Sequence, residues 1–109
     1  MNESTFQIVI RNAHARSTRV LAGKRVEYSP GEDRLSNFKK AGELQGVTPE
    51  AALVGMLTKH YVSICEMVGQ IGVGYVPYGL GVWNEKLDDA RNYLFLLEAL
   101  VRERYGWTP

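Results

Sequence analysis

The N-terminal part of the chain carries apolar residues at alternating steps of three and four positions, the spacing of one face of an α-helix. This spacing predicts a helix that starts near Phe6 and is ended by Ser29, Pro30 and Gly31. A short strand over residues 6–10 (FQIVI) is the alternative, because so short a run does not distinguish the two periods. The helix is favoured because the stripe continues for several more turns. Its members are Phe6, Ile10, Ala13, Ser17, Leu21, Lys24 and Tyr28.

A second, shorter helix is predicted over residues 33–45, with Gly46 as its C-terminal stop. The segment is mixed in character, and its pattern is the weakest in the chain. The helix would present three apolar positions, namely Leu35, Phe38 and Leu44.

Three agreeing signals mark the start of the next helix. Thr48 is a good N-cap, Pro49 fits the first helical position and Glu50 places an acid in the first turn. The pattern predicts a helix from Pro49 to about Val68. The inward stripe of this helix comprises Leu53, Met56, Leu57, His60, Ile64 and Met67.

Five glycines and one proline fall between Gly69 and Val82, which predicts a loop there. The last helix is expected to run from Trp83 or Asn84 to Tyr105, closed by Gly106. The whole chain, residues 1–109, is therefore predicted to be one all-α domain, a small bundle of three main helices and a short fourth. An apolar seam suited to helix packing is predicted on the last helix. It comprises Trp83, Leu87, Ala90, Leu94, Leu97 and Val101.

Composition narrows the class of protein. The 109 residues suit a single domain, 45% of them are hydrophobic, and the formal net charge of +1 gives no electrostatic case for a DNA, RNA or membrane partner. The polar start MNESTFQ lacks the basic region of a secretory signal, so we expect a cytoplasmic protein. The single cysteine, Cys65, cannot form an internal disulfide.

Acidic and amide side chains crowd the start of the last helix, where they share one side of it: Glu85, Asp88, Asp89 and Asn92. The same side becomes apolar further along, at Leu96 and Leu100, so it is expected to be covered. The side expected to face water carries Arg91, Glu98 and Arg102. Buried carboxylates need cations, which arginine, lysine or a divalent metal ion would supply.

Charged residues also end the stripe of the first helix, at Lys24 and Glu27. Such residues are either exposed at a helix end or part of a site. His60 lies mid-stripe and is expected in the core, as a hydrogen-bonded histidine rather than a ligand. Lys59 belongs either to an ordinary polar face or to a site for an anion.

Four segments together resemble the all-α nucleoside triphosphate pyrophosphohydrolases, the MazG-like superfamily, and its small phage and prophage relatives. The resemblance spans about residues 19–103, and the segments are KRVEY (24–28), DRLSNF (33–38), TPEAALVGMLTKH (48–60) and EKLDDARNYLFLL (85–97). In that superfamily, acidic motifs on two helices hold Mg²⁺ ions that bind a triphosphate and activate water. The resemblance implies a nucleotide ligand and Mg²⁺ or Mn²⁺ as cofactor.

Glu85 and Asp88 match the E-x-x-D motif of the superfamily, and Asn92 matches the asparagine that follows it in closer relatives. Glu27 resembles the acid of the first motif, but Lys24 stands where that motif carries its other acid. One acid is therefore missing, which weakens the case for two-metal chemistry. Asp33 or Glu32 is a candidate replacement.

The leading hypothesis is therefore a metal-dependent protein that hydrolyses or binds a nucleoside triphosphate. Its metal ligands would be Glu27, Glu85, Asp88 and Asp89. Its catalytic residues would be Glu27, Lys59 and Asn92. Nucleotide contacts would come from Lys24, Lys59, His60, Tyr78 and Trp83.

Two other hypotheses belong to different classes. The first is a non-catalytic phage protein that sequesters a host nucleotide signal in the cytoplasm of the infected cell. The second is a structural helical protein whose acids pair with Lys24, Lys59 and Arg34. Under each hypothesis we expect a homo-oligomer, a dimer or larger, because the last helix is apolar on two sides.

Overall fold

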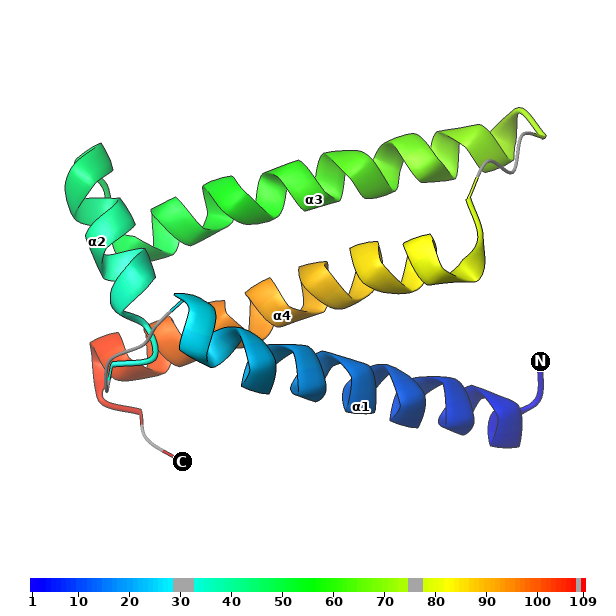
Figure 1. The fold of residues 1–109 in the computed structure, drawn as a ribbon, viewed down its shortest axis with the longest axis horizontal. Helices are drawn as coiled ribbons and strands as arrows, with labels where there is room; N and C mark the ends of the chain where they lie inside the picture. The colour runs from blue at the N-terminus through cyan, green and yellow to red at the C-terminus, as the bar shows by residue number, and fades with distance from the viewer. Residues whose placement is uncertain (29–32, 75–77, 108) are drawn as a thin grey trace.

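The computed structural model describes residues 1–28, 33–74, 78–107 and 109, except for the side chains of residues 24–28. In these ranges the chain forms helices and no strand, which confirms the predicted all-α class. Figure 1 shows the four helices, α1 (Glu3–Tyr28), α2 (Ser36–Gln45), α3 (Pro49–Gly72) and α4 (Leu80–Tyr105). None of these helices is long and apolar enough to cross a membrane.

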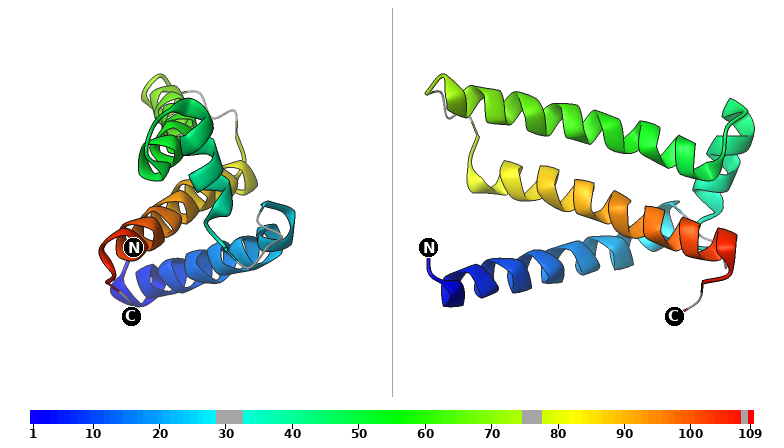
Figure 2. Two further views of the ribbon diagram at one scale, coloured as in Figure 1. Left: turned by 90° about the vertical axis from the view of Figure 1, so that its left-hand side faces the viewer. Right: turned by 180° about the vertical axis from the view of Figure 1, so that it is seen from behind.

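Helix α4 lies between α1 and α3 (Figure 1). Helices α1 and α4 run in the same direction and α3 runs in the opposite one. The short α2 packs across the end of the bundle, against α3 (Figure 2). The two ends of the chain lie at opposite ends of the long axis of the bundle (Figures 1 and 2).

Cap geometry confirms three of the predicted helix ends, the start of α3 and the ends of α2 and α4. Thr48 Oγ1 accepts a hydrogen bond of 3.1 Å from the Ala51 N–H, so it caps α3 as expected. Gly46 and Gly106 follow α2 and α4 with φ of 69°, the left-handed conformation that favours glycine at a helix C-terminus. The residues FQIVI belong to α1, so the strand alternative is wrong.

The predicted loop over residues 69–82 is too long. Helix α3 continues through Gly72, and α4 begins at Leu80 rather than at Trp83. Glycine inside a helix costs only about 1 kcal/mol, so apolar neighbours that continue the pattern carry a helix through it. Part of the predicted loop, residues 75–77, lies outside the described residues.

A small core holds α2, α3 and α4 together around Leu53, which has no exposed surface. It is built from Leu35, Phe38, Leu53 and Leu100, with Met56, Tyr93, Leu96 and Leu97 packed against it. The prediction that Leu44 is an apolar contact is wrong, because this side chain is 80% exposed. It lies in the last turn of α2, two residues before the Gly46 cap.

The seam expected on α4 forms the predicted helix contact only in part: Leu97 packs against the core, but two of its leucines are exposed. Leu87 and Leu94 are 37% and 54% exposed, because α4 turns a different face to α3. That face carries Tyr93, Leu96, Leu97 and Leu100. On α1 the predicted stripe is buried at Ala13 and Ser17 but exposed at Phe6 and Ile10.

Candidate functional site

The acidic side of α4 is covered at Asp88 and Asn92, as the sequence predicted, but not at Glu85. Asp88 and Asn92 retain 5% and 6% of their surface, and Leu100 further along the helix retains 3%. Glu98 and Arg102 on the expected outer side are exposed, whereas Arg91 is half-buried. A carboxylate buried to this degree requires a nearby cation.

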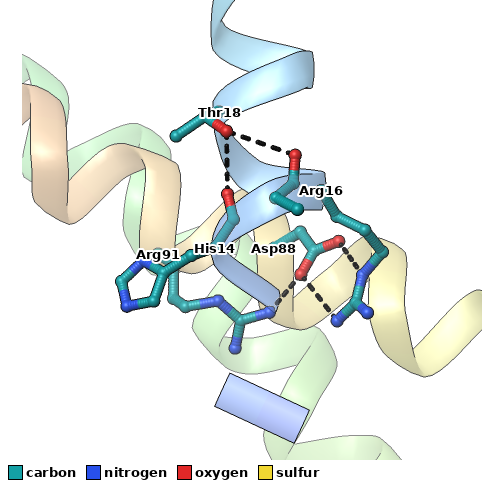
Figure 3. Close-up of polar contacts among 6 residues, drawn as sticks. His14, Arg16, Thr18, Asp88 and Arg91 are labelled. Carbon is teal, nitrogen blue, oxygen red and sulfur yellow. Dashed lines mark hydrogen bonds and ion pairs between the residues drawn. The ribbon is translucent and has the colours of Figure 1, made fainter. Parts of the chain in front are cut away.

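Two arginines supply that cation (Figure 3). Arg16 of α1 donates from Nε to Asp88 Oδ2 at 2.9 Å and from Nη2 to Oδ1 at 3.3 Å. Arg91, one turn along α4, donates from Nη2 to Asp88 Oδ1. Both carboxylate oxygens of Asp88 therefore accept hydrogen bonds from guanidinium groups, and the cluster joins α1 to α4.

The other predicted metal ligands are spread around this cluster. Glu85 is exposed, and Asp89 is half-buried with Oδ2 3.8 Å from His60 Nδ1. The side chains of Lys24 and Glu27 and all of Glu32 lie outside the described residues, and Asp33 pairs with Lys39 at 2.7 Å. Among the described residues no three acidic, histidine or cysteine side chains are placed to hold a metal ion.

Arg16 and Arg91 already neutralise the Asp88 carboxylate, and their charges disfavour a divalent cation beside it. The side chain of Glu27, another predicted ligand, lies outside the described residues, so the Mg²⁺ or Mn²⁺ site that the resemblance implies stays a prediction.

A pocket of about 320 Å³ opens next to the cluster, between α2, α3 and α4. Its walls are mainly apolar and aromatic, with a small number of polar groups converging on one space, the usual composition of a ligand site. The lining residues are Leu21, Arg34, Asn37, Phe38, Met56, His60, Asp89, Asn92, Tyr93 and Leu96.

Asn92 is the least satisfied polar group of this pocket. Its amide is buried, and neither Nδ2 nor Oδ1 has a hydrogen-bond partner. Leaving a buried donor and acceptor unpaired costs about 1–3 kcal/mol for each group. Both atoms are covered by the pocket wall, so a ligand with one acceptor and one donor would remove that cost only if the side chains over the Asn92 amide moved aside.

His60 lines the pocket rather than the core, which corrects the expected position of this residue. Its side chain is 25% exposed, and its ring lies 5.1 Å from that of Tyr93 at a tilt of 40°. At this level of the inward stripe the pocket, rather than packed side chains, lies next to the ring. His60 and Tyr93 together form an aromatic wall.

Three predicted nucleotide contacts lie elsewhere. Lys59 is exposed on α3, Tyr78 precedes α4 and is 41% exposed, and Trp83 is half-buried in the first turn of α4. None of these three lines the pocket. The structure brings Asn92, His60 and Asp89 together and leaves these three outside.

Sequence reasoning missed the contribution of Arg34 and Asn37 to the pocket. The sequence suggested Arg34 only as a partner for acidic side chains. In the structure Arg34 lies at the edge of the pocket, where its Nη2 donates a hydrogen bond of 3.2 Å to the Leu21 carbonyl. Both residues lie in the DRLSNF segment (33–38), whose resemblance to the pyrophosphohydrolases was the one signal that pointed to them.

Comparison of the chain with protein-family models, with curated proteins and with solved structures gave no match. The likeness to the MazG-like superfamily therefore stays a prediction from short motifs. What the chain does has to be argued from the pocket itself.

Proposed function

We propose that the chain binds a nucleotide in the pocket between α2, α3 and α4, and that it does so without hydrolysing it. The observation that carries the proposal is Asn92, a buried amide with both polar atoms unpartnered at the wall of a 320 Å³ pocket. A side chain in this state is costly in the free protein and is satisfied by a ligand.

The chemistry of an amide favours a nucleobase as that ligand. Asn92 presents one donor and one acceptor side by side, which matches the adjacent donor and acceptor on the edge of a base. The flat walls formed by Phe38 and Tyr93 suit a planar ring. The base would lie with this edge toward α4 once the side chains that cover the Asn92 amide had moved aside.

Arg34 at the edge of the pocket supports a phosphate-bearing ligand rather than a free base. A guanidinium group matches the geometry of phosphate oxygens and stays charged at every physiological pH. His60 adds a second nitrogen to the pocket, next to Asp89. The sugar and phosphates would then extend from the base toward Arg34.

The ion pairs of Asp88 favour binding over hydrolysis. The E-x-x-D acid that the resemblance assigns to a metal ion is held by Arg16 and Arg91. The same cluster meets the need of this carboxylate for cations without a metal. A purely structural role is less favourable, because it leaves the cost of the unpaired Asn92 amide without a benefit.

Thermal melts with a panel of nucleotides test this proposal. We expect one or more nucleoside mono-, di- or triphosphates to raise the melting temperature in a concentration-dependent way, with EDTA present as well as with Mg²⁺. A chain whose melting temperature is unchanged by every nucleotide at millimolar concentration would contradict binding. Pyrophosphate released from a triphosphate in the presence of Mg²⁺ would contradict the non-catalytic part.

A further inference from the structure

The side of α4 that points away from the pocket is apolar and exposed. Leu94 is two residues from Asn92, about 200° of helix rotation, so it lies on the opposite side of α4. Leu87 lies on that side too. Leu87 is 37% exposed and Leu94 is 54% exposed. They belong to the predicted seam and are the two residues of it that stay exposed among the described residues.

Helix α3 extends this apolar surface. Three residues of α3 each come one position after a residue of the inward stripe, namely Val54, Tyr61 and Val68. One position corresponds to about 100° of rotation, so these side chains lie on the flank of α3 beside the side that faces α4. Met56 lines the pocket from the other flank. The three residues are 44%, 63% and 55% exposed and recur every seven positions, the repeat that packs helix on helix. The inward residues that precede them are Leu53, His60 and Met67.

We call this surface the outer face and define it by Val54, Tyr61, Val68, Leu87 and Leu94. A groove of about 540 Å³ runs along the C-terminal half of α4 on this side. Trp107 forms one wall of the groove and is held by stacking on Tyr105 at 4.9 Å. The lining residues are Leu94, Leu97, Glu98, Val101, Arg102 and Trp107.

The exposed area of the chain is too large for a folded monomer of its mass. The accessible surface is 7723 Å², whereas a compact monomer of 12.2 kDa exposes about 6,100 Å². The radius of gyration of 16.2 Å likewise exceeds the value of about 13 Å expected for this length. The excess of roughly 1,600 Å² is about twice the area that each partner buries in a standard protein–protein interface.

We infer that the outer face is the contact between two copies of this chain. A second copy is favoured over a different partner because the excess area of one chain matches what each subunit of a permanent dimer buries. The formal net charge of +1 also leaves little repulsion between two copies. In a two-fold pair each outer face covers the other, and both pockets stay open on the far sides.

Molar mass in solution tests this inference through matched variants. The parent chain should have about twice the mass of 12.2 kDa by light scattering over the micromolar range. Leu94→Glu and Tyr61→Glu, each on the outer face, should halve that mass. Leu44→Glu, an exposed leucine of α2 away from this face, should leave it unchanged. A monomeric parent overturns the inference, and so does a dimer that persists in both outer-face variants.

Cys65 provides a second test that needs no substitution and decides the matter if the glutamate variants do not fold. This cysteine lies between Tyr61 and Val68 along the same flank of α3 and is exposed in the single chain. Contact between two copies should slow its reaction with a thiol reagent at least tenfold in the native protein relative to the chain unfolded in urea. Equal rates in the two states would overturn the inference.

Discussion

At the scale of single residues, the account depends on two buried polar side chains that sit four positions apart on α4. Asp88 is satisfied, because both of its oxygens accept hydrogen bonds from guanidinium groups. Asn92 is not satisfied, because both of its amide atoms lack a partner. The helix therefore carries one group that stabilises the fold and another that is available for a ligand.

Replacing Asp88 with asparagine should destabilise the protein. The change leaves Arg16 and Arg91 without their carboxylate at a partly buried contact, so we expect the free energy of unfolding to fall by about 1–3 kcal/mol. Urea unfolding followed by circular dichroism measures this quantity. Glu85→Gln, which removes the charge of an exposed carboxylate one turn earlier on α4, is the control and should have little effect.

The response of the Asp88→Asn variant to metal separates the two roles considered for this residue. A structural ion pair predicts that the parent and the variant melt at the same temperatures with Mg²⁺ as with EDTA. If Mg²⁺ raised the melting temperature of the parent and the variant lost that rise, the metal site implied by the resemblance would be supported instead.

At the scale of elements, the contact between the end of α2 and the start of α3 sets the position of the core. Gly42 lies against this turn so closely that an added Cβ atom would come within 2.8 Å of the Val47 carbonyl oxygen and 2.9 Å of the Pro49 nitrogen. Those neighbours are backbone atoms held by the Thr48 cap, so they cannot move aside without loss of the cap.

Alanine at this glycine should therefore be costly. We expect Gly42→Ala to lower the free energy of unfolding by about 2–4 kcal/mol, because the new methyl group forces the two helices apart. Gly55→Ala is the matched control, since nothing lies within 4 Å of its added Cβ. Helix propensity predicts that this control raises stability by up to about 1 kcal/mol. Equal effects at the two positions in chemical unfolding would contradict the close contact.

A paired carboxylate links the start of α3 to the end of α4. Glu50 accepts hydrogen bonds from Arg104 Nε at 2.6 Å and from Nη2 at 2.8 Å. These bonds lower the pKa of Glu50 below its ordinary value of 4.5. A lowered carboxyl pKa adds stability that is present above the unfolded value and is lost as the pH falls through the folded value.

Acidification should thus weaken the parent more than the variant Glu50→Gln. The measurement is the free energy of unfolding at neutral pH and below pH 4.5 in both proteins. Glu43→Gln, which changes an exposed carboxylate on α2, controls for general charge effects. A pH dependence that is identical in the parent and in Glu50→Gln would show that this pair does not contribute.

The sequence predicted elements well where local chemistry determines them and poorly where tertiary contacts do. Backbone chemistry determines the three helix caps at Gly46, Thr48 and Gly106, and the sequence predicted all three. Which apolar stripe of α4 would be covered could not be decided, because Leu94 and Leu100 look alike in a pattern and differ only in which helix lies over them.

In the candidate site, too, the sequence predicted what depends on the helix pattern and not what depends on contacts between helices. The covered position of Asp88 and Asn92 was predicted, because their side of α4 continues into Leu96 and Leu100. The identity of the cation was not, since Arg16 lies 72 positions away in the sequence and its partner depends on how α1 crosses α4. The contribution of Arg34 and Asn37 to the pocket was not predicted either, because it also depends on how the helices pack.

At the scale of the whole molecule, the helices form an open arrangement with two different faces. One face holds the pocket with the Asn92 amide, and the other is the outer face on which we infer a second copy. Ligand binding and assembly are therefore expected to be separable. Leu94→Glu should become monomeric and still bind the nucleotide that the parent binds, with an affinity within about threefold, a free-energy change of under 1 kcal/mol.

The central claim is that the unpaired amide of Asn92 receives the ligand, and a calorimetric titration of parent and Asn92→Leu tests it most directly. Leucine keeps the branched skeleton of the side chain, is somewhat larger, and removes both polar atoms. The titrant is the nucleotide that gives the largest thermal shift with the parent. Asn84→Leu, the same change on α4 outside the pocket, is the control.

The account predicts that Asn92→Leu binds this nucleotide about tenfold or more weakly than the parent, because the donor and acceptor of the base are then left unpaired. The variant without ligand should be as stable as the parent or more stable by about 1–2 kcal/mol, since the substitution removes an unsatisfied buried amide. Asn84→Leu should bind like the parent. Undiminished affinity in Asn92→Leu would contradict the claim.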